Sequence, residues 1–196
     1  MIFNSYIFIF LFLPITLGGY FIIGQLDNHK LSITWLVVAS LFFYGRWNPA
    51  YLILIISSIL FNYSIGLALR SYSKNSKNYS LLAVGILGNL GLIGYYKYAN
   101  FFVDGFNWAL DLNFQLETII LPLAISFFTF QQIAYLVDVY NREISEHNFL
   151  NYCLFVTFFP QLIAGPIVHH KEMLPQFAKS YAKSLSSKNI AIGITI

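Results

Sequence analysis

Residues 6–24 read YIFIFLFLPITLGGYFIIG, an apolar run of 19 residues. As an α-helix, a run of this length rises about 30 Å, which matches the hydrocarbon thickness of a bilayer. The chain carries no charged side chain from Met1 to Leu26, so the basic segment that begins a signal peptide is absent. We therefore predict a retained transmembrane helix over 6–24.

The same apolar character extends over the whole chain. Of its 196 residues, 58% are hydrophobic and 10% are charged, whereas a soluble domain carries about 25% charged residues. The net charge of +3 is too small to attract a polyanion. This composition excludes a soluble globular domain, a disordered chain and a nucleic-acid-binding protein. We predict an all-α, polytopic transmembrane protein.

Few side chains in the sequence could bind a metal ion or act as a nucleophile. Cys153 is the single cysteine, so neither an intramolecular disulfide nor a thiolate cluster can form. His169 and His170 form the one histidine pair, but adjacent residues of a helix point about 100° apart. The sequence has no nucleophile elbow, P-loop or dinucleotide-binding motif. We predict no metal site and no bound cofactor.

Polar breaks divide the chain into about five spans and one broken apolar run. The predicted spans are 6–24, 31–45, 50–69, 81–98 and 119–140, and the broken run is 149–168. A further apolar run begins at Ile190.

The distribution of Lys and Arg predicts the orientation in the membrane. The connection 70–80 holds three basic residues and no acid, which is typical of a cytoplasmic loop. The stretch 100–118 holds three acidic residues and neither Lys nor Arg. Alternation of the spans then places both 100–118 and the N-terminus outside the cytoplasm.

The run 149–168 conflicts with a simple crossing. The stretch after it, 169–188, holds four Lys and one Glu, which favours the cytoplasm, the side from which the run starts. Pro160, Gly165 and Pro166 interrupt the run, and proline breaks a helix. Broken backbone at membrane depth needs protein or a water-filled cavity around it. We predict that 149–168 enters from the cytoplasm and returns, or lies buried in the protein.

Polar residues inside apolar spans are candidates for structural or functional roles. Gln131 and Gln132 lie in the fifth span, and helix–helix hydrogen bonding is the simplest role for them. Asp138 and Arg142 are four residues apart. On a continuing helix they would share a face and could pair. The alternative for that pair is an anchor at the membrane interface.

Several stretches of the sequence resemble motifs of the membrane-bound O-acyltransferase family, in particular its alginate O-acetyltransferase branch. They are FFPQLIAGPIV (158–168) with HKEMLPQF (170–177), LPLAISFFTFQQ (121–132), YLVDVY (135–140) and SLFFY (40–44) ahead of Trp47 and Asn48-Pro49. Together they extend over nearly the whole chain.

The resemblance implies transfer of an acyl group, acetyl in this branch, to hydroxyls of an extracytoplasmic polysaccharide such as alginate. It implies an enzyme in the cell's inner membrane. Its acyl donor, acetyl-CoA or an acyl-carrier thioester, would arrive from the cytoplasm as a substrate. Extracytoplasmic acetylation proteins would be partners. The family's catalytic histidine lies late in the chain and would act as a general base.

None of the four histidines here matches that late position, so we assign no catalytic residue to this chain. We expect 1–196 to be the N-terminal part of a single membrane-embedded domain, inactive alone. The residues expected along the path of the donor or substrate are Pro160, Gln161, Gly165, Pro166, His169, His170 and Lys171. The alternative is that the prolines and glycine are architectural and that Lys171 anchors to anionic lipid.

Two other functions remain open at this point. A transporter or polysaccharide-export subunit would use the broken helix to line a substrate path. A non-catalytic scaffold fragment would use the same helices for assembly alone. A histidine within an apolar stretch downstream would favour the acyltransferase.

Overall fold

The structure is a computed structural model, and it confirms the predicted all-α class. It describes residues 5–26, 28–71, 78–111, 114, 119–144, 148–165, 173, 176–177, 191–193 and 195. Within these ranges the chain forms helices and no strand. The elements are the π-helical turn η1 (Phe8–Phe12), α1 (Leu13–Gln25), α2 (His29–Gly45), α3 (Ala50–Ser71), α4 (Tyr79–Ile93), the π-helical turn η2 (Gly94–Tyr98), α5 (Ala99–Leu110), α6 (Ile125–Tyr140), α7 (Phe149–Thr157) and α8 (Phe159–Ala164).

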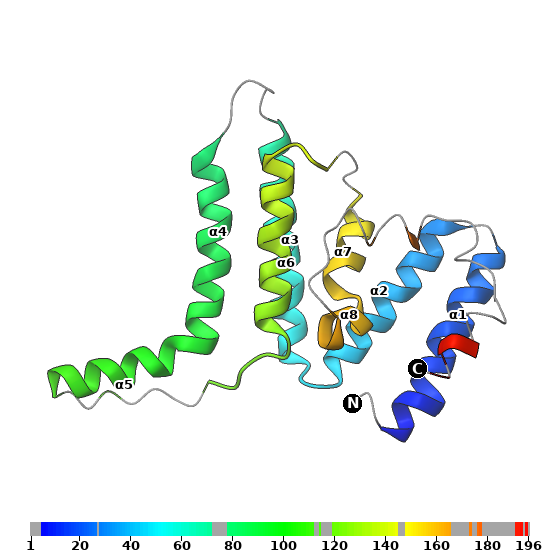
Figure 1. Cartoon of the computed structure of the whole chain (residues 1–196), viewed down its shortest axis with the longest axis horizontal. Helices are drawn as coiled ribbons and strands as arrows, with labels where there is room; N and C mark the ends of the chain where they lie inside the picture. Colours follow the sequence, from blue (N-terminus) through cyan, green and yellow to red (C-terminus); the bar gives the residue numbers. More distant parts are fainter. Residues whose placement is uncertain are drawn as a thin grey trace.

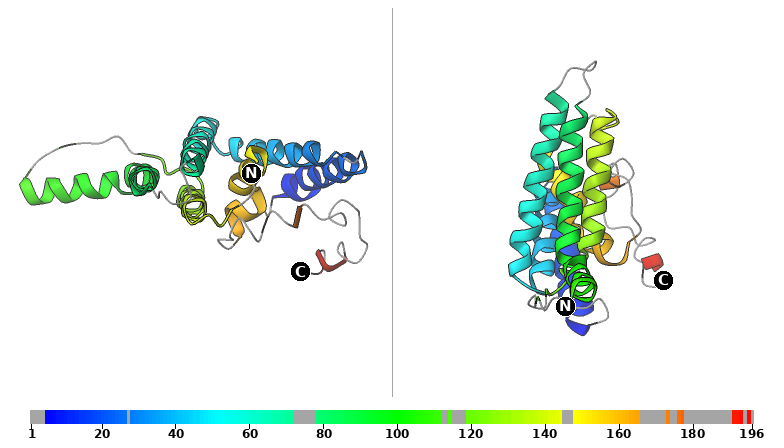
Figure 2. Two further views of the ribbon diagram at one scale, coloured as in Figure 1. Left: turned by 90° about the horizontal axis from the view of Figure 1, so that it is seen from above. Right: turned by 90° about the vertical axis from the view of Figure 1, so that its left-hand side faces the viewer.

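The helices stand side by side in a flat row (Figures 1 and 2). Helices α3, α4 and α6 pack against one another in one half of the row, and α1 packs against α2 in the other half. The short helix α7 lies between the two halves, where it contacts α2, α3 and α6. Residues far apart in the sequence therefore meet around α7.

Three helical stretches in the described part of the chain are long and apolar enough to cross a bilayer: Phe8–Gln25, Ala50–Ser71 and Tyr79–Leu110. They include the first, third and fourth predicted spans. Helices α2 and α6 have 17 and 16 residues, at or just below the lower limit of about 17 residues for a transmembrane helix, so the total of five spans stays a prediction. Many large apolar side chains on these helices are exposed, as expected where lipid is the solvent. The chain is a multi-pass membrane protein.

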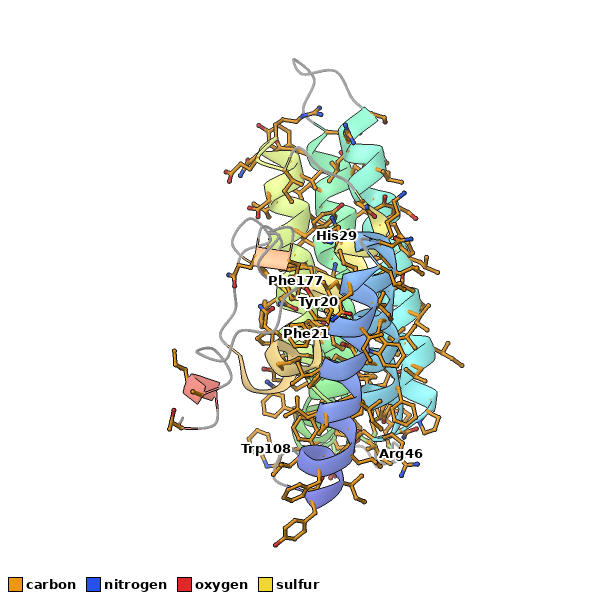
Figure 3. All side chains as sticks on the ribbon, turned by 90° about the vertical axis from the view of Figure 1, so that its right-hand side faces the viewer. Tyr20, Phe21, His29, Arg46, Trp108 and Phe177 are labelled. Atoms are coloured by element: carbon orange, nitrogen blue, oxygen red, sulfur yellow. The ribbon has the colours of Figure 1, made fainter. Side chains whose placement is uncertain are left out.

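The helix ends are distributed as the predicted alternation requires. In Figure 1, α3 ends and α4 begins at the same end of the row at which α6 ends and α7 begins. In Figure 3, His29 lies toward one end, and Arg46 and Trp108 lie at the other.

Helices α2, α4 and α7 begin at the end of the bundle toward which His29 lies, and each of them has an asparagine as its N-cap. The side-chain oxygens of Asn28, Asn78 and Asn148 accept hydrogen bonds from the backbone N–H groups of Leu31, Leu81 and Leu150 at 3.3, 3.0 and 2.9 Å. Each bond satisfies one of the N–H groups that the first turn of a helix leaves without a partner.

The structure differs from the sequence-based expectation after Tyr98. We treated 100–118 as a mixed extramembrane stretch, but its first part continues the helix as α5, to Leu110. Helix α5 turns sideways from α4 at η2 (Figure 1). A π-helical turn inside an α-helix is a recognised cause of such a bend.

A buried set of polar side chains joins α3, α4 and α6. We call Ser58, Asn62, Asn89 and Gln132 the polar clasp. The Oγ of Ser58 donates to the Oε1 of Gln132 at 3.0 Å, and the Nδ2 of Asn62 donates to the same oxygen. The Nδ2 of Asn62 also donates to Oδ1 of Asn89 at 3.1 Å, and Asn89 donates back to Oδ1 of Asn62. The clasp fixes the rotation of all three helices, because each side chain can reach its partners only from one face.

The clasp predicts the effect of Asn62→Leu. This substitution keeps the approximate volume but removes both hydrogen bonds to Asn89 and one of the two donors to the Oε1 of Gln132, so we expect the free energy of unfolding to fall by about 1–3 kcal/mol. Thermal or denaturant unfolding in detergent measures it. The matched control on the same helix is Ser64→Ala, which removes an exposed hydroxyl bonded to its own helix.

A second variant separates lost hydrogen bonds from altered packing. Replacing Asn62, Asn89 and Gln132 together by Leu removes the orphaned polar groups, so part of the stability should return. An equal loss in the Asn62 variant and in the Ser64 control would contradict the role of the clasp.

Candidate functional site

The candidate site is centred on the break between α7 and α8. Helix α7 ends at Thr157, Phe158 is extended with ψ 105°, and α8 begins at Phe159. Pro160 explains the break, because it has no backbone N–H and its ring would press on the carbonyl four residues earlier in a continuing helix. The interruption that the sequence predicted is present at this position.

The backbone groups exposed by the break find partners inside the protein. The N–H of Phe159 donates to the Oγ of Ser40 on α2 at 3.3 Å. The N–H groups of Gln161 and Leu162 donate to the carbonyl of Phe158 at 3.1 and 2.9 Å. These bonds satisfy the condition under which lipid tolerates an interrupted helix.

An aromatic cluster holds the first residue of α8. The Phe159 ring lies 6.0, 5.2 and 5.4 Å from the rings of Phe8, Phe12 and Phe43, measured between centroids. Such contacts add to the burial of the rings. The break is therefore joined to the N-terminal helix and to α2 at one point.

Two tyrosines hold the non-helical residues that precede α6. The hydroxyl of Tyr44 donates to the carbonyl of Leu123 at 3.1 Å, and the hydroxyl of Tyr51 donates to the carbonyl of Ile120. Ala124, just before α6, has φ 56°, a left-handed conformation that costs free energy for a residue with a Cβ. The tyrosines from α2 and α3 thus fix the position at which α6 begins.

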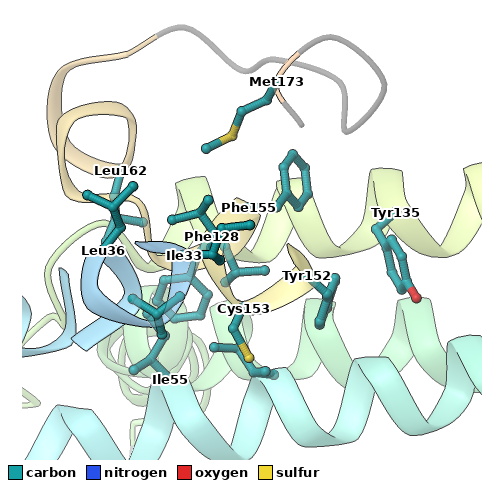
Figure 4. Packing of buried hydrophobic residues seen from close by; sticks show 14 of the residues in the cluster. Ile33, Leu36, Ile55, Phe128, Tyr135, Tyr152, Cys153, Phe155, Leu162 and Met173 are labelled. Atoms are coloured by element: carbon teal, nitrogen blue, oxygen red, sulfur yellow. The ribbon is translucent and has the colours of Figure 1, made fainter. Parts of the chain in front are cut away.

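A pocket of about 300 Å³ lies between this stretch and α8. It is lined by residues 121–127 together with Leu162, so that Ser126 supplies its one hydroxyl. Figure 4 shows Leu162 beside Leu36, and the hydrophobic cluster continues from there along α7. The pocket is the place where α8 meets the start of α6.

The described residues beyond the break lie back against α7. Met173 is buried near Phe155 (Figure 4), and the Phe177 ring lies 5.3 Å from that of Phe158. In Figure 3, Phe177 lies toward the end of the bundle that carries His29 and away from Arg46 and Trp108.

Three buried side chains near α7 have polar atoms without a partner. Within the part of the chain that the structure describes, both polar atoms of Gln131, the Nε2 of Gln161 and the hydroxyl of Tyr152 make no hydrogen bond. Gln131 is 1% exposed, so bulk solvent does not reach it. Unpaired buried groups of this kind are uncommon and call for an explanation.

The predicted polar residues divide between two roles. Gln132 belongs to the polar clasp, whereas its neighbour Gln131 has no partner. Helix α6 ends at Tyr140, so Asp138 and Arg142 do not lie on one continuing helix. Arg142 has φ 61°, and its guanidinium donates to the carbonyl of Arg70 at the C-terminus of α3 at 3.0 Å. A cation is favourable at that end of a helix.

The remaining predicted residues are only partly described. Pro160, Gln161 and Gly165 lie in or directly after α8. Pro166, His169, His170 and Lys171 fall outside the described residues. Across the described ranges, no group of three His, Cys, Asp or Glu side chains could hold a metal ion.

The motifs distant in sequence meet at this break. Ser40, Phe43 and Tyr44 of the motif 40–44 contact Phe159 of the motif 158–168 and Leu123 of the motif 121–132. The model of MBOAT, the membrane-bound O-acyltransferase family, matches residues 138–196. The chain belongs to the membrane-bound O-acyltransferase family. This confirms the resemblance that the motifs indicated.

Named relatives extend the match over the rest of the chain. A peptidoglycan O-acetyltransferase of Helicobacter pylori is 43% identical over 100% of the chain and 42% of the relative. Probable alginate O-acetylases of Pseudomonas aeruginosa and Pseudomonas putida are 38% and 40% identical over 90% of the chain and 34% and 37% of the relatives. The chain thus spans between a third and a little over two fifths of their length. No solved structure matches it.

Sequence reasoning missed the residues that hold the site of this family member together. Ser40 and Tyr44 were part of a quoted motif, but nothing in the sequence assigned them as the acceptor for Phe159 and the donor to Leu123. Tyr51 was not singled out at all. A hydroxyl within an apolar span was the available signal, since such a group needs a partner in lipid.

Gly165 provides a test of how closely the break is packed. A Cβ at this position would lie 2.7 Å from the Cα and 3.0 Å from the carbonyl oxygen of Gln161, so the backbone of α8 would have to move. We expect Gly165→Ala to lower the thermal unfolding temperature in detergent. The matched control is Gly91→Ala on α4, where a Cβ meets nothing within 4 Å. The prediction fails if both variants unfold at the wild-type temperature.

Proposed function

We propose that the complete protein is an O-acetyltransferase that acts on a polysaccharide outside the cytoplasm. The observation that carries this proposal is the 34–43% identity to named O-acetyltransferases and O-acetylases over 90–100% of the chain. The acceptors in the relatives' names, peptidoglycan and alginate, share one chemistry, because each is a glycan with free hydroxyl groups. The acceptor proposed here is accordingly a glycan hydroxyl.

The proposed reaction needs a general base. The acceptor oxygen attacks the thioester carbonyl, the new C–O bond forms, and the C–S bond breaks so that the donor's thiol departs with the proton. An alcohol gives up its proton poorly at neutral pH, and a histidine suits that task. In this proposal none of His29, His147, His169 or His170 receives the role.

The break between α7 and α8 fits a membrane-embedded reaction. The unpaired polar atoms of Gln131, Tyr152 and Gln161 could form hydrogen bonds with a thioester or a hydroxyl that enters the interior. The pocket at Leu162 is mainly apolar, as a site that excludes water would be. These features support a reaction site at the break between α7 and α8, which lies within the motif 158–168.

The proposed donor is acetyl-CoA or an acyl-carrier thioester, bound as a substrate from the cytoplasmic side. Lys171, with His169 or His170, would face its phosphate groups, since ammonium and imidazolium groups attract anions. We further propose that the protein lies in the inner membrane with its N-terminus outside. Extracytoplasmic acetylation proteins would then meet the end of the bundle that carries Trp108.

The proposed topology predicts how introduced cysteines react. In a Cys153→Ala background, Ser145→Cys and Ser180→Cys should both react with an impermeant maleimide only from the cytoplasmic side. The controls are Ser71→Cys, expected to react from the same side, and Asp111→Cys, expected to react from the opposite side. Reaction of positions 145 and 180 from opposite sides would show that 149–168 crosses the membrane.

The proposed activity predicts ester-linked acetate on a cell-envelope glycan. Expression of the complete reading frame in a strain that lacks its own O-acetylation should add acetate that mild base releases from the purified glycan. Lys171→Ala should lower the yield at limiting donor while the amount of protein in the membrane is unchanged. The matched control, Lys188→Ala, lies in the same basic stretch outside the motif.

The outcomes of this assay separate the alternatives. Unchanged acetylation by the Lys171 variant would contradict the donor role and leave the acyl transfer intact. Expression that adds no acetate but increases the amount of exported polysaccharide would favour the exporter and contradict the proposed function.

A further inference from the structure

Helix α5 is amphipathic with a narrow polar face. Asn100, Asp104, Asn107 and Asp111 recur at spacings of four, three and four residues, so at 100° a residue they fall within about 60° of the helix circumference. All other positions from Phe101 to Leu110 are apolar or glycine. The polar stripe is therefore one narrow line along an otherwise apolar helix.

The apolar part of α5 has no cover within the described structure. No residue of the helix is buried, and Trp108 is 90% exposed. The other large exposed side chains are Phe101, Phe102, Phe106 and Leu110. Trp and Phe on a helix with a polar opposite face are typical of segments at a membrane–water interface.

The exposed apolar stripe of α4 continues onto α5. It runs along Val84, Leu87, Tyr95 and Tyr98, all exposed, and reaches Phe102 one turn later. Helix α4 and η2 together cover Tyr79 to Tyr98, which at 1.5 Å a residue rises about 30 Å and suffices to cross the hydrocarbon core. The segment after Tyr98 is not needed to cross the membrane.

The direction of α5 fits a helix that lies in the plane of the membrane. It leaves the end of α4 sideways and extends away from the row of upright helices (Figures 1 and 2). Lys97, at the bend, lies with its Nζ 5.4 Å from the centre of the Tyr98 ring. A lysine beside tyrosines is a common anchor at the level of the lipid headgroups.

From these observations we propose that α5 is an interfacial helix whose apolar face is embedded in the lipid of the leaflet at which α4 ends. Its polar face then points to water. That face is acidic and not basic, so burial of apolar side chains holds the helix at the membrane and attraction to anionic headgroups does not. The occupant of the exposed face is the lipid bilayer itself.

The polar face already has a structural use that agrees with this orientation. The side chain of Asn107 donates to the carbonyl of Phe114 at 2.8 Å and accepts from its N–H at 3.0 Å. Asp111, with φ 53°, ends the helix in a left-handed conformation. The chain after α5 is thus held on the side of the helix that we assign to water.

Two positions on opposite faces of α5 provide the test. Phe102→Cys and Asp104→Cys lie about 160° apart on the helix, and both side chains are exposed, so neither substitution should disturb folding. Each variant is made in the complete protein with Cys153→Ala, spin-labelled, and reconstituted in vesicles of phosphatidylethanolamine and phosphatidylglycerol. Electron paramagnetic resonance then compares relaxation of the label by oxygen, which concentrates in lipid, and by a water-soluble nickel chelate.

The proposal predicts that oxygen relaxes the label at 102 more strongly than the nickel chelate and that this order inverts at 104. As an independent measurement, brominated phospholipids should quench the tryptophan fluorescence of Trp108. The variant Trp108→Phe identifies that part of the emission, because it removes it. Strong relaxation by nickel at both positions would place α5 in water, and weak relaxation by both reagents at 102 would place it against protein. Either result overturns the proposal.

Discussion

The structure depends on one constraint: inside lipid, every buried polar group needs a partner from the protein itself. The polar clasp supplies such partners between α3, α4 and α6, although the Nε2 of Gln132 has none among the described residues. Asn62 lies at its centre, because its amide bonds to Gln132 on α6 and to Asn89 on α4. Apolar contacts alone would let these helices rotate, since lipid tails are as apolar as leucine. The clasp removes that freedom and sets which face of α6 is turned toward α7.

The position of the break follows from this arrangement. Once the clasp turns Gln132 toward α3 and α4, the face of α6 that carries Phe128 and Tyr135 packs with α7, and the Tyr135 and Tyr152 rings lie 4.3 Å apart. Helix α7 can then stop at Thr157 because Ser40 on α2 accepts from the first N–H of α8. Pro160 causes the interruption, but the neighbouring helices make it possible within a membrane.

The sequence was sufficient for features that local chemistry decides. The length of the apolar run 6–24 predicted the first span, and Pro160 predicted the break. Features that depend on pairing between helices were not predictable: adjacent Gln131 and Gln132 look alike in sequence, and only the rotation of α6 separates them. The end of α6 before Arg142 also depends on tertiary contact, through the bond from that side chain to Arg70. Helix α5 was missed because acidic residues in 100–118 suggested a loop, although their spacing was helical.

The two sets of buried polar groups differ in a way that bears on function. In the clasp, hydrogen bonds within the protein use the side-chain amides of Asn62 and Asn89 and the Oε1 of Gln132, and among the described residues only the Nε2 of Gln132 is left without a partner there. Beside the break, Gln131, Tyr152 and the Nε2 of Gln161 keep their hydrogen-bonding capacity, although leaving such a group unpaired costs about 1–3 kcal/mol. A membrane protein that served only as a scaffold would gain stability by replacing these side chains with apolar ones. Their presence where the family motifs converge supports the polar reactants that we propose, because binding would supply the missing partners.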